Sequence, residues 1–259
     1  MKYRESTGRP WDSRQAICSL LLALAIAQAV FAAAPGIDLV VSGLFFDPER
    51  GFWLAGIPAL IVVRTVLRAW VWVLAVPVTL ILTLVLCRRL PLRLGARPWI
   101  FTLACLGIGP GLIVNVLLKD HWGRARPADI LQFGATARFT PAFQITDQCG
   151  RNCSFTSGEA ATISTTAMVL IILAWPLASR AARRAMSLGL GTLVAVGSGL
   201  RIAMGRHFLS DVVFSILICA LVVAVVHRAT GMDRFAGIGW RALGADLRSL
   251  VGPRTNQKV

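Results

Sequence analysis

Six runs of apolar residues, each close to the length that crosses a bilayer, constrain this chain more than any other feature. They lie at about residues 16-35, 67-87, 98-118, 157-177, 186-204 and 209-227. A membrane-spanning helix needs roughly 20 such residues. Of the 259 residues, 56% are hydrophobic and only 15% are charged, whereas about a quarter are charged in an average soluble protein. The sequence therefore predicts an all-α, polytopic membrane protein with a bundle of six transmembrane helices, and it excludes an ordinary soluble protein.

Two apolar segments leave room for other interpretations. The first run follows several basic residues and ends in Ala32, Ala33 and Ala34, as a cleavable signal peptide also would. We expect a retained span, because this run is longer than the ~7 to 15 residues of a signal sequence. The patch from Ile57 to Val63 is too short to cross the membrane. It predicts an interfacial helix between the first two spans.

The basic residues set the expected orientation. Lys and Arg outnumber Asp and Glu by 27 to 12, but they are spread between the apolar runs, so no nucleic-acid partner is predicted. With the amino terminus inside, 17 basic residues fall on the inner side and 10 on the outer side, which favours two cytoplasmic termini. We expect a basic amino terminus (1-15), a six-span domain (16-227) and a basic tail on the cytoplasmic headgroups (228-259).

Three polar clusters at span ends need an explanation, because positive charge on the outer side opposes the insertion bias. They are Lys119-x6-Arg126-Pro127 after the third run, Ser157-Gly158-Glu159 before the fourth, and Arg201-x5-His207-x3-Asp211 between the fifth and sixth. In the expected topology all three lie on the same membrane face. The sequence therefore predicts that they form one site.

These clusters resemble the three motifs of the type 2 phosphatidic acid phosphatases, which share a signature with the vanadium haloperoxidases. The motifs are Lys-x6-Arg-Pro, Pro-Ser-Gly-His and Ser-Arg-x5-His-x3-Asp. The chain departs from them at Thr156 in place of Pro, Glu159 in place of the second His, and Leu200 in place of Ser. The resemblance implies a helical core like that of both families and a phosphatase activity.

Phosphate chemistry calls for the same residue types. A phosphoryl-transfer transition state spreads negative charge over three equatorial oxygens, so fixed cations and backbone donors stabilise it. We expect Lys119, Arg126 and Arg201 to bind the phosphate, together with backbone N–H groups of Ser157 and Gly158 at a helix start. The alternatives are basic side chains that merely reach the headgroups and a Ser157 that only caps its helix.

The resemblance implies that His207 is the nucleophile and forms a phosphohistidine. Asp211, four residues later on one helix face, can accept from one ring nitrogen, although a purely structural pair is an alternative. No metal or other cofactor is implied, because His121 is the only other outside imidazole and no carboxylate cluster accompanies it. Cys149 and Cys153 favour a disulfide in an oxidising compartment over half of a zinc site.

Glu159 leaves the leaving-group chemistry open. In the family, the His at this position protonates the departing alkoxide, whereas a carboxyl beside three cations should be ionised. Either burial keeps Glu159 protonated, or His121 donates the proton, or the leaving group needs none, as in a pyrophosphate. A Glu at this position is similar to the bacterial lipid A phosphatase branch of the family.

The resulting interpretation is a bacterial inner-membrane phosphatase whose site faces the periplasm. Its expected partners are the membrane and a phosphorylated lipid, with no obligate protein partner. Lipid A is the first expected substrate, followed by undecaprenyl pyrophosphate and then phosphatidylglycerophosphate or phosphatidic acid. A phosphotransferase with the same intermediate and a non-catalytic lipid-binding or transport protein are the alternatives. Transport is disfavoured, because transporters place charges near the bilayer midplane.

Overall fold

The computed structural model describes residues 12–87 and 95–232, and helices dominate it. The chain is 74% helical and has no sheet in the described part. Six helices are long and apolar enough to span a membrane, by length and composition: α1 (Ser13–Ala33), α3 (Pro58–Leu86), a third span (Arg97–His121), α6 with its extension η5 (Gly158–Leu177), α7 (Arg180–Ala203) and α8 (Leu209–Ala229). The prediction of an all-α, six-helix membrane protein is therefore confirmed.

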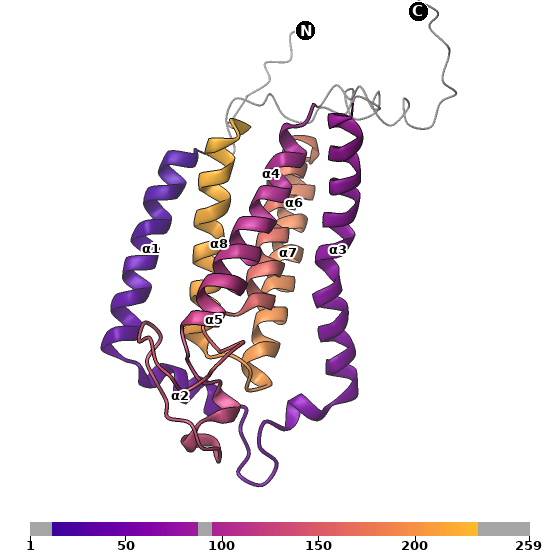
Figure 1. The fold of residues 1–259 in the computed structure, drawn as a ribbon. Coiled ribbons are helices and arrows are strands. Elements are labelled where there is room, and N and C mark those ends of the chain that lie inside the picture. The colour runs from indigo at the N-terminus through magenta and orange to yellow at the C-terminus, as the bar shows by residue number, and fades with distance from the viewer. Residues whose placement is uncertain (1–11, 88–94, 233–259) are drawn as a thin grey trace, which may run out of the picture.

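Helix α8 lies at the centre of the bundle (Figure 1). It packs against α1 on one side and α6 on the other. Within the 18-residue apolar stretch of each helix, 61% of the residues of α8 are buried, against 6% of those of α1 and of α3. Phe101 of the third span and Val169 of α6 pack with Val223 of α8 in the main apolar cluster. The outer helices expose apolar side chains such as Leu22 and Val62, as lipid-facing helices do.

The third span changes its helical geometry along its length. It begins as α4 (Arg97–Leu106), continues as a π-helical segment, η2 (Gly107–Leu118), and ends in one turn, α5 (Lys119–His121). Within η2, the Asn115 side chain donates to the carbonyl of Pro110 at 2.7 Å. Departures from α-helical geometry often accompany functional sites, and this one ends at Lys119.

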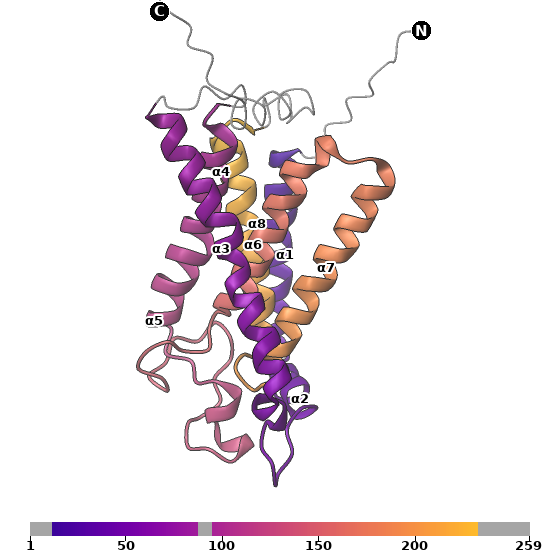
Figure 2. The same ribbon diagram turned by 90° about the vertical axis from the view of Figure 1, so that its right-hand side faces the viewer.

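The short elements gather at one end of the bundle, opposite the start of α1 (Figures 1 and 2). They are α2 (Gly36–Gly43), η1 (Trp53–Gly56), η3 (Pro127–Asp129) and η4 (Leu131–Phe133). An aromatic cluster fixes the long connection between α5 and α6: Trp122 stacks on Phe155 at 4.8 Å and Phe143 meets Phe214 of α8 edge-on at 4.4 Å. All three motif clusters lie at this end.

The prediction of an interfacial helix over Ile57 to Val63 was wrong. These residues form the start of α3, which begins at Pro58 and continues without a break to Leu86. Pro58 occupies the first turn, where proline is well tolerated. Arg64, which follows this patch, is accommodated in the helix because Glu159 of α6 pairs with its guanidinium.

Other predictions fall partly outside the described residues. Most of the basic amino terminus (1-15) and of the basic tail (228-259) lies in residues 1–11 and 233–259, which the structure does not describe. Among the spans, the fifth helix starts at Arg180 rather than at 186, because Ser179 caps it by accepting from the Ala182 amide at 3.2 Å.

Candidate active site

The structure brings most of the motif residues together at one end of the bundle, opposite the start of α1. Lys119 comes from α5, Ser157 caps α6, and Arg201 lies in the last turn of α7. His207 lies two residues after Gly205. Gly205 has a φ of +65° in the turn after α7 and packs against the Phe52 ring. Clusters separated by 30 or more residues in the sequence thus meet at one place.

His207 is buried and points one ring nitrogen at the backbone. Its Nδ1 lies 2.8 Å from the carbonyl oxygen of Ser154, and because a carbonyl only accepts, Nδ1 carries the proton and Nε2 keeps its lone pair. The pKa of His207 lies well below its ordinary value, first because of burial and then because of the charges of Arg201 and Lys119. The site therefore contains a neutral imidazole with one free nitrogen.

The spacing of His207 and Asp211 suggested that Asp211 accepts a hydrogen bond from the ring, but it does not. Its Oδ2 lies 3.9 Å from His207 Nδ1 because other donors occupy the carboxylate. Oδ2 accepts from the Ser154 hydroxyl at 2.5 Å and from the Phe208 amide at 2.8 Å. Asp211 thus fixes the two residues that flank the imidazole: Ser154, whose carbonyl orients the ring, and Phe208, the next residue in the chain.

Sequence reasoning missed the cation that holds Asp211. Arg124 is fully buried and donates to Asp211 Oδ1 at 2.6 Å, to Asp38 Oδ2 at 2.8 Å and to the Thr140 carbonyl at 2.8 Å. Ser210 joins the network by donating to Asp38 at 2.5 Å. One guanidinium therefore balances two buried carboxylates, one of them from α2, which none of the motifs includes.

Arg201 has unused donors in a buried position. Its side chain is 6% exposed, and its Nε and Nη1 atoms are buried with no hydrogen-bond partner among the described residues. Buried donors without a partner are costly, which makes them suited to an anionic ligand. Lys119 is partly buried. Arg126 already donates to the Asn152 carbonyl at 2.6 Å.

The start of α6 permits close approach to these cations. Ser157 caps the helix by accepting from the Ala160 amide at 3.4 Å. A Cβ on Gly158 would collide with the Asn115 amide and lie 3.4 Å from Lys119 Nζ. Glycine is therefore required where α6 begins, and Asn115, which sequence reasoning missed, lines the same spot. Only its place in the π-helical segment reveals it.

Glu159 lies between two guanidinium groups. Its Oε1 accepts from Arg64 Nε and Nη2, both at 3.1 Å, and its Oε2 is 3.4 Å from Arg201 Nε. Both carboxylate oxygens of Glu159 are thus engaged by guanidinium groups. Sequence reasoning missed Arg64, although an arginine inside an apolar span signals a buried partner.

His121, the other expected proton donor, forms its hydrogen bonds with its own helix. It is exposed, and its Nδ1 contacts the carbonyls of Leu117 at 3.0 Å and Val116 at 3.2 Å on its own helix. None of its contacts within residues 12–87 and 95–232 reaches another site residue.

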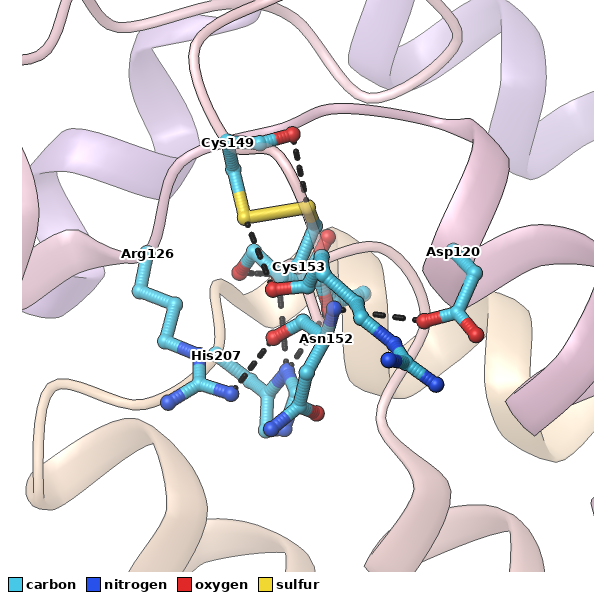
Figure 3. Close-up of a disulfide and its surroundings, with 9 residues drawn as sticks. Asp120, Arg126, Cys149, Asn152, Cys153 and His207 are labelled. Atoms are coloured by element: carbon cyan, nitrogen blue, oxygen red, sulfur yellow. Dashed lines mark hydrogen bonds and ion pairs between the residues drawn. A yellow bond between two sulfur atoms is a disulfide. The ribbon is translucent and has the colours of Figure 1, made fainter.

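A disulfide closes a five-residue loop over the site (Figure 3). Cys149 and Cys153 are bonded, with their Cα atoms 5.6 Å apart. Between them, the Asn152 carbonyl accepts from Arg126 (Figure 3), and the Cys153 amide donates to the Lys119 carbonyl at 3.1 Å. The loop thus contacts both cationic residues of the first motif and leads directly into Ser154.

Comparison with known families identifies the family of this chain. Residues 98–235 match the model of the PAP2 superfamily. The chain belongs to the PAP2 superfamily. The match covers more than half of the chain and contains every motif residue described above. No solved structure is significantly similar.

Three relatives of this chain are named lipid A 4'-phosphatase. The one from Rhizobium leguminosarum is 33% identical over 221 residues, covering 78% of this chain and 91% of that protein. The one from Rhizobium etli (strain ATCC 51251 / DSM 11541 / JCM 21823 / NBRC 15573 / CFN 42) is 31% identical over 227 residues, covering 78% and 82%. The one from Francisella tularensis subsp. novicida (strain U112) is 41% identical over 125 residues, 47% of this chain and about half (54%) of that protein.

As a PAP2 member with these relatives, the chain is an enzyme, a lipid phosphatase that hydrolyses phosphoric monoesters. It is also a multi-pass membrane protein of bacterial type. Within residues 12–87 and 95–232, no group of three or more His, Cys, Asp or Glu side chains is arranged to hold a metal ion.

Proposed function

We propose that this PAP2 protein removes a phosphate from lipid A at the periplasmic face of the inner membrane, through a phosphohistidine on His207. One observation carries the proposal: the buried imidazole of His207, with Nε2 free, lies near Arg201, whose Nε and Nη1 find no hydrogen-bond partner in the described part of the chain. A nucleophile and an anion-binding group are thereby combined at one site. The names of the three relatives support lipid A as the substrate.

The reaction proceeds in two displacements. His207 Nε2 attacks phosphorus, an N–P bond forms, and the ester P–O bond breaks to release the lipid alkoxide, which takes a proton. Water then attacks phosphorus, the N–P bond breaks, and inorganic phosphate leaves with His207 neutral again. Lys119, Arg126 and Arg201 stabilise the charge on the three equatorial oxygens. Asp211 keeps Ser154 in place, and the Ser154 carbonyl orients the ring.

Two features support the periplasmic placement. The distribution of Lys and Arg, 17 to 10 by the predicted topology, favours cytoplasmic termini and puts the site on the opposite face. The disulfide between Cys149 and Cys153 lies at the site's end of the bundle, and disulfides persist in the periplasm rather than in the cytosol. A lipid of the outer leaflet then reaches the site from the side.

Phosphate release from defined lipids tests the proposal. Purified protein in detergent is incubated with lipid A, undecaprenyl pyrophosphate, phosphatidylglycerophosphate and phosphatidic acid, with and without a chelator. We expect the fastest release from lipid A, no effect of the chelator and no release by His207→Ala. Release of phosphate by His207→Ala at the wild-type rate, or no release from any of these lipids, would contradict the proposal. Phosphate that appears on an acceptor instead of in solution would indicate a transferase.

A further inference from the structure

Arg64 lies on α3, outside all three motifs. Its Nε and Nη2 atoms both bind Glu159 Oε1 at 3.1 Å, and its side chain is 31% exposed. Two nitrogens on one carboxylate leave the third, Nη1, unbound to Glu159. Glu159 thereby holds Arg64 beside the anion site from a helix more than 90 residues away in the sequence.

Glu159 supplies the negative charge between two arginines. Glu159 is 16% exposed and also lies 3.4 Å from Arg201, so one carboxylate is shared by two guanidinium groups. Without that carboxylate, two like charges would face each other in a partly buried place. The same pairing directs both oxygens of Glu159 at guanidinium groups, Oε1 at Arg64 and Oε2 at Arg201.

We propose that Arg64 is a fourth cation that contacts the substrate phosphate and that Glu159 is the positioning residue for Arg64 and Arg201. This inference rests on the proposed function. The site has an arginine–carboxylate pair where the sequence motif would have a histidine. The departing alkoxide takes its proton from water, since both oxygens of Glu159 face guanidinium groups.

Variants of Arg64 and Glu159 test the inference on two substrates, lipid A and an aryl phosphate, whose leaving group needs no proton. We expect Arg64→Ala and Glu159→Gln each to slow both substrates by about 10²-fold, the usual cost of one lost oxyanion donor. The two substrates should suffer similarly, because phosphate binding is impaired and not protonation of the leaving group. Arg68→Ala is the matched control, an exposed arginine one turn further along α3, and it should keep wild-type rates.

Two further measurements separate a contact role from misfolding. The double variant Arg64→Ala/Glu159→Ala should be no slower than the slower single Ala variant, because Glu159 acts through the arginines. Added guanidinium ion should partly restore Arg64→Ala and should not restore His207→Ala.

The outcomes that would overturn the inference are distinct from a failure of the proposed function. A loss in Glu159→Gln confined to lipid A would assign acid catalysis to Glu159. Full activity of Arg64→Ala would show that Arg64 does not contact the phosphate. Losses that multiply in the double variant would show that Glu159 does not act through Arg64. If the wild type releases phosphate from neither substrate, the proposed function itself fails.

Discussion

His207 keeps one ring nitrogen free because a backbone carbonyl, and not a carboxylate, engages the other. The Ser154 carbonyl accepts from Nδ1 at 2.8 Å, while Asp211 stays 3.9 Å away. The Asp211 carboxylate is therefore near the imidazole but makes no hydrogen bond to it. Burial and two nearby cations lower the pKa of the ring. The nucleophile is kept neutral by its surroundings rather than by a partner.

This environment predicts how His207 titrates. Because its pKa is lowered from 6.5, the neutral form should persist as the pH falls through 6.5, and protonation should begin only below that value. Nitrogen NMR of histidine-labelled protein, assigned by comparison with His207→Ala, measures this. A midpoint at or above pH 6.5 would mean that the site stabilises the imidazolium instead.

Arg124 supports the nucleophile from a distance. Replacing it with Ala would leave Asp38 and Asp211 buried without their shared cation, which typically costs about 3–5 kcal/mol of unfolding free energy. We expect Arg124→Ala to lower the thermal unfolding temperature in detergent and to remove most of the activity. Arg138→Ala, an exposed arginine of the same connection, is the control. Equal unfolding temperatures in the two variants would show that the network is not structural.

Among the elements, the disulfide-closed loop of residues 149–153 has the most contacts with the site. It binds Arg126 through the Asn152 carbonyl and Lys119 through the Cys153 amide. The next residue, Ser154, contacts His207, Asp211 and the Arg124 carbonyl. A crosslink therefore restrains the segment that positions both the nucleophile and the cations.

Reduction of this disulfide should lower activity. A shift of about 1 Å in catalytic groups can cost up to about 10²-fold in rate, so we expect a clear loss when the wild type is treated with a reductant. The variant Cys149→Ala/Cys153→Ala should start at the lower rate and be unaffected by reductant. If both proteins keep the untreated wild-type rate, the loop does not position the site.

Sequence patterns predicted the spans and the convergence of the motif residues because both depend on local features. Hydropathy identifies the segments that cross the membrane. The ends of spans on one membrane face must lie near one another. Arg124 with Asp38 and Arg64 with Glu159 were missed, because each pair joins residues more than 80 positions apart and only tertiary packing brings them together. The start of α3 was misread as a separate short apolar patch, although Arg64 after that patch lies in the same helix and pairs with Glu159 of α6.

At the scale of the whole molecule, the charges that matter lie at one end of the bundle. The helices supply an apolar frame, and the motif clusters, α2 and the long connection before α6 gather at the end opposite the start of α1 (Figures 1 and 2). If this end lies in the periplasm, its basic residues oppose the insertion bias, and a role in binding phosphate accounts for them.

Cysteine labelling tests this orientation. In a background that keeps the disulfide but lacks Cys18, Cys87, Cys105 and Cys219, single cysteines are introduced in 128–148, in 88–97 and in 230–259. An impermeant thiol reagent applied from the periplasm should label only those in 128–148. The opposite pattern would place the site in the cytoplasm and remove outer-leaflet lipid A as a substrate.

The central claim is that His207 carries the phosphate during turnover, and trapping the intermediate tests it most directly. Protein is mixed with lipid A labelled in its phosphate and quenched in alkali, in which phosphohistidine survives. We predict label on wild-type protein at His207, more label in Asp211→Asn if its second step is slowed more than its first, and none in His207→Ala. Label of equal amount on His207→Ala, or phosphate release by that variant at the wild-type rate, would contradict the account.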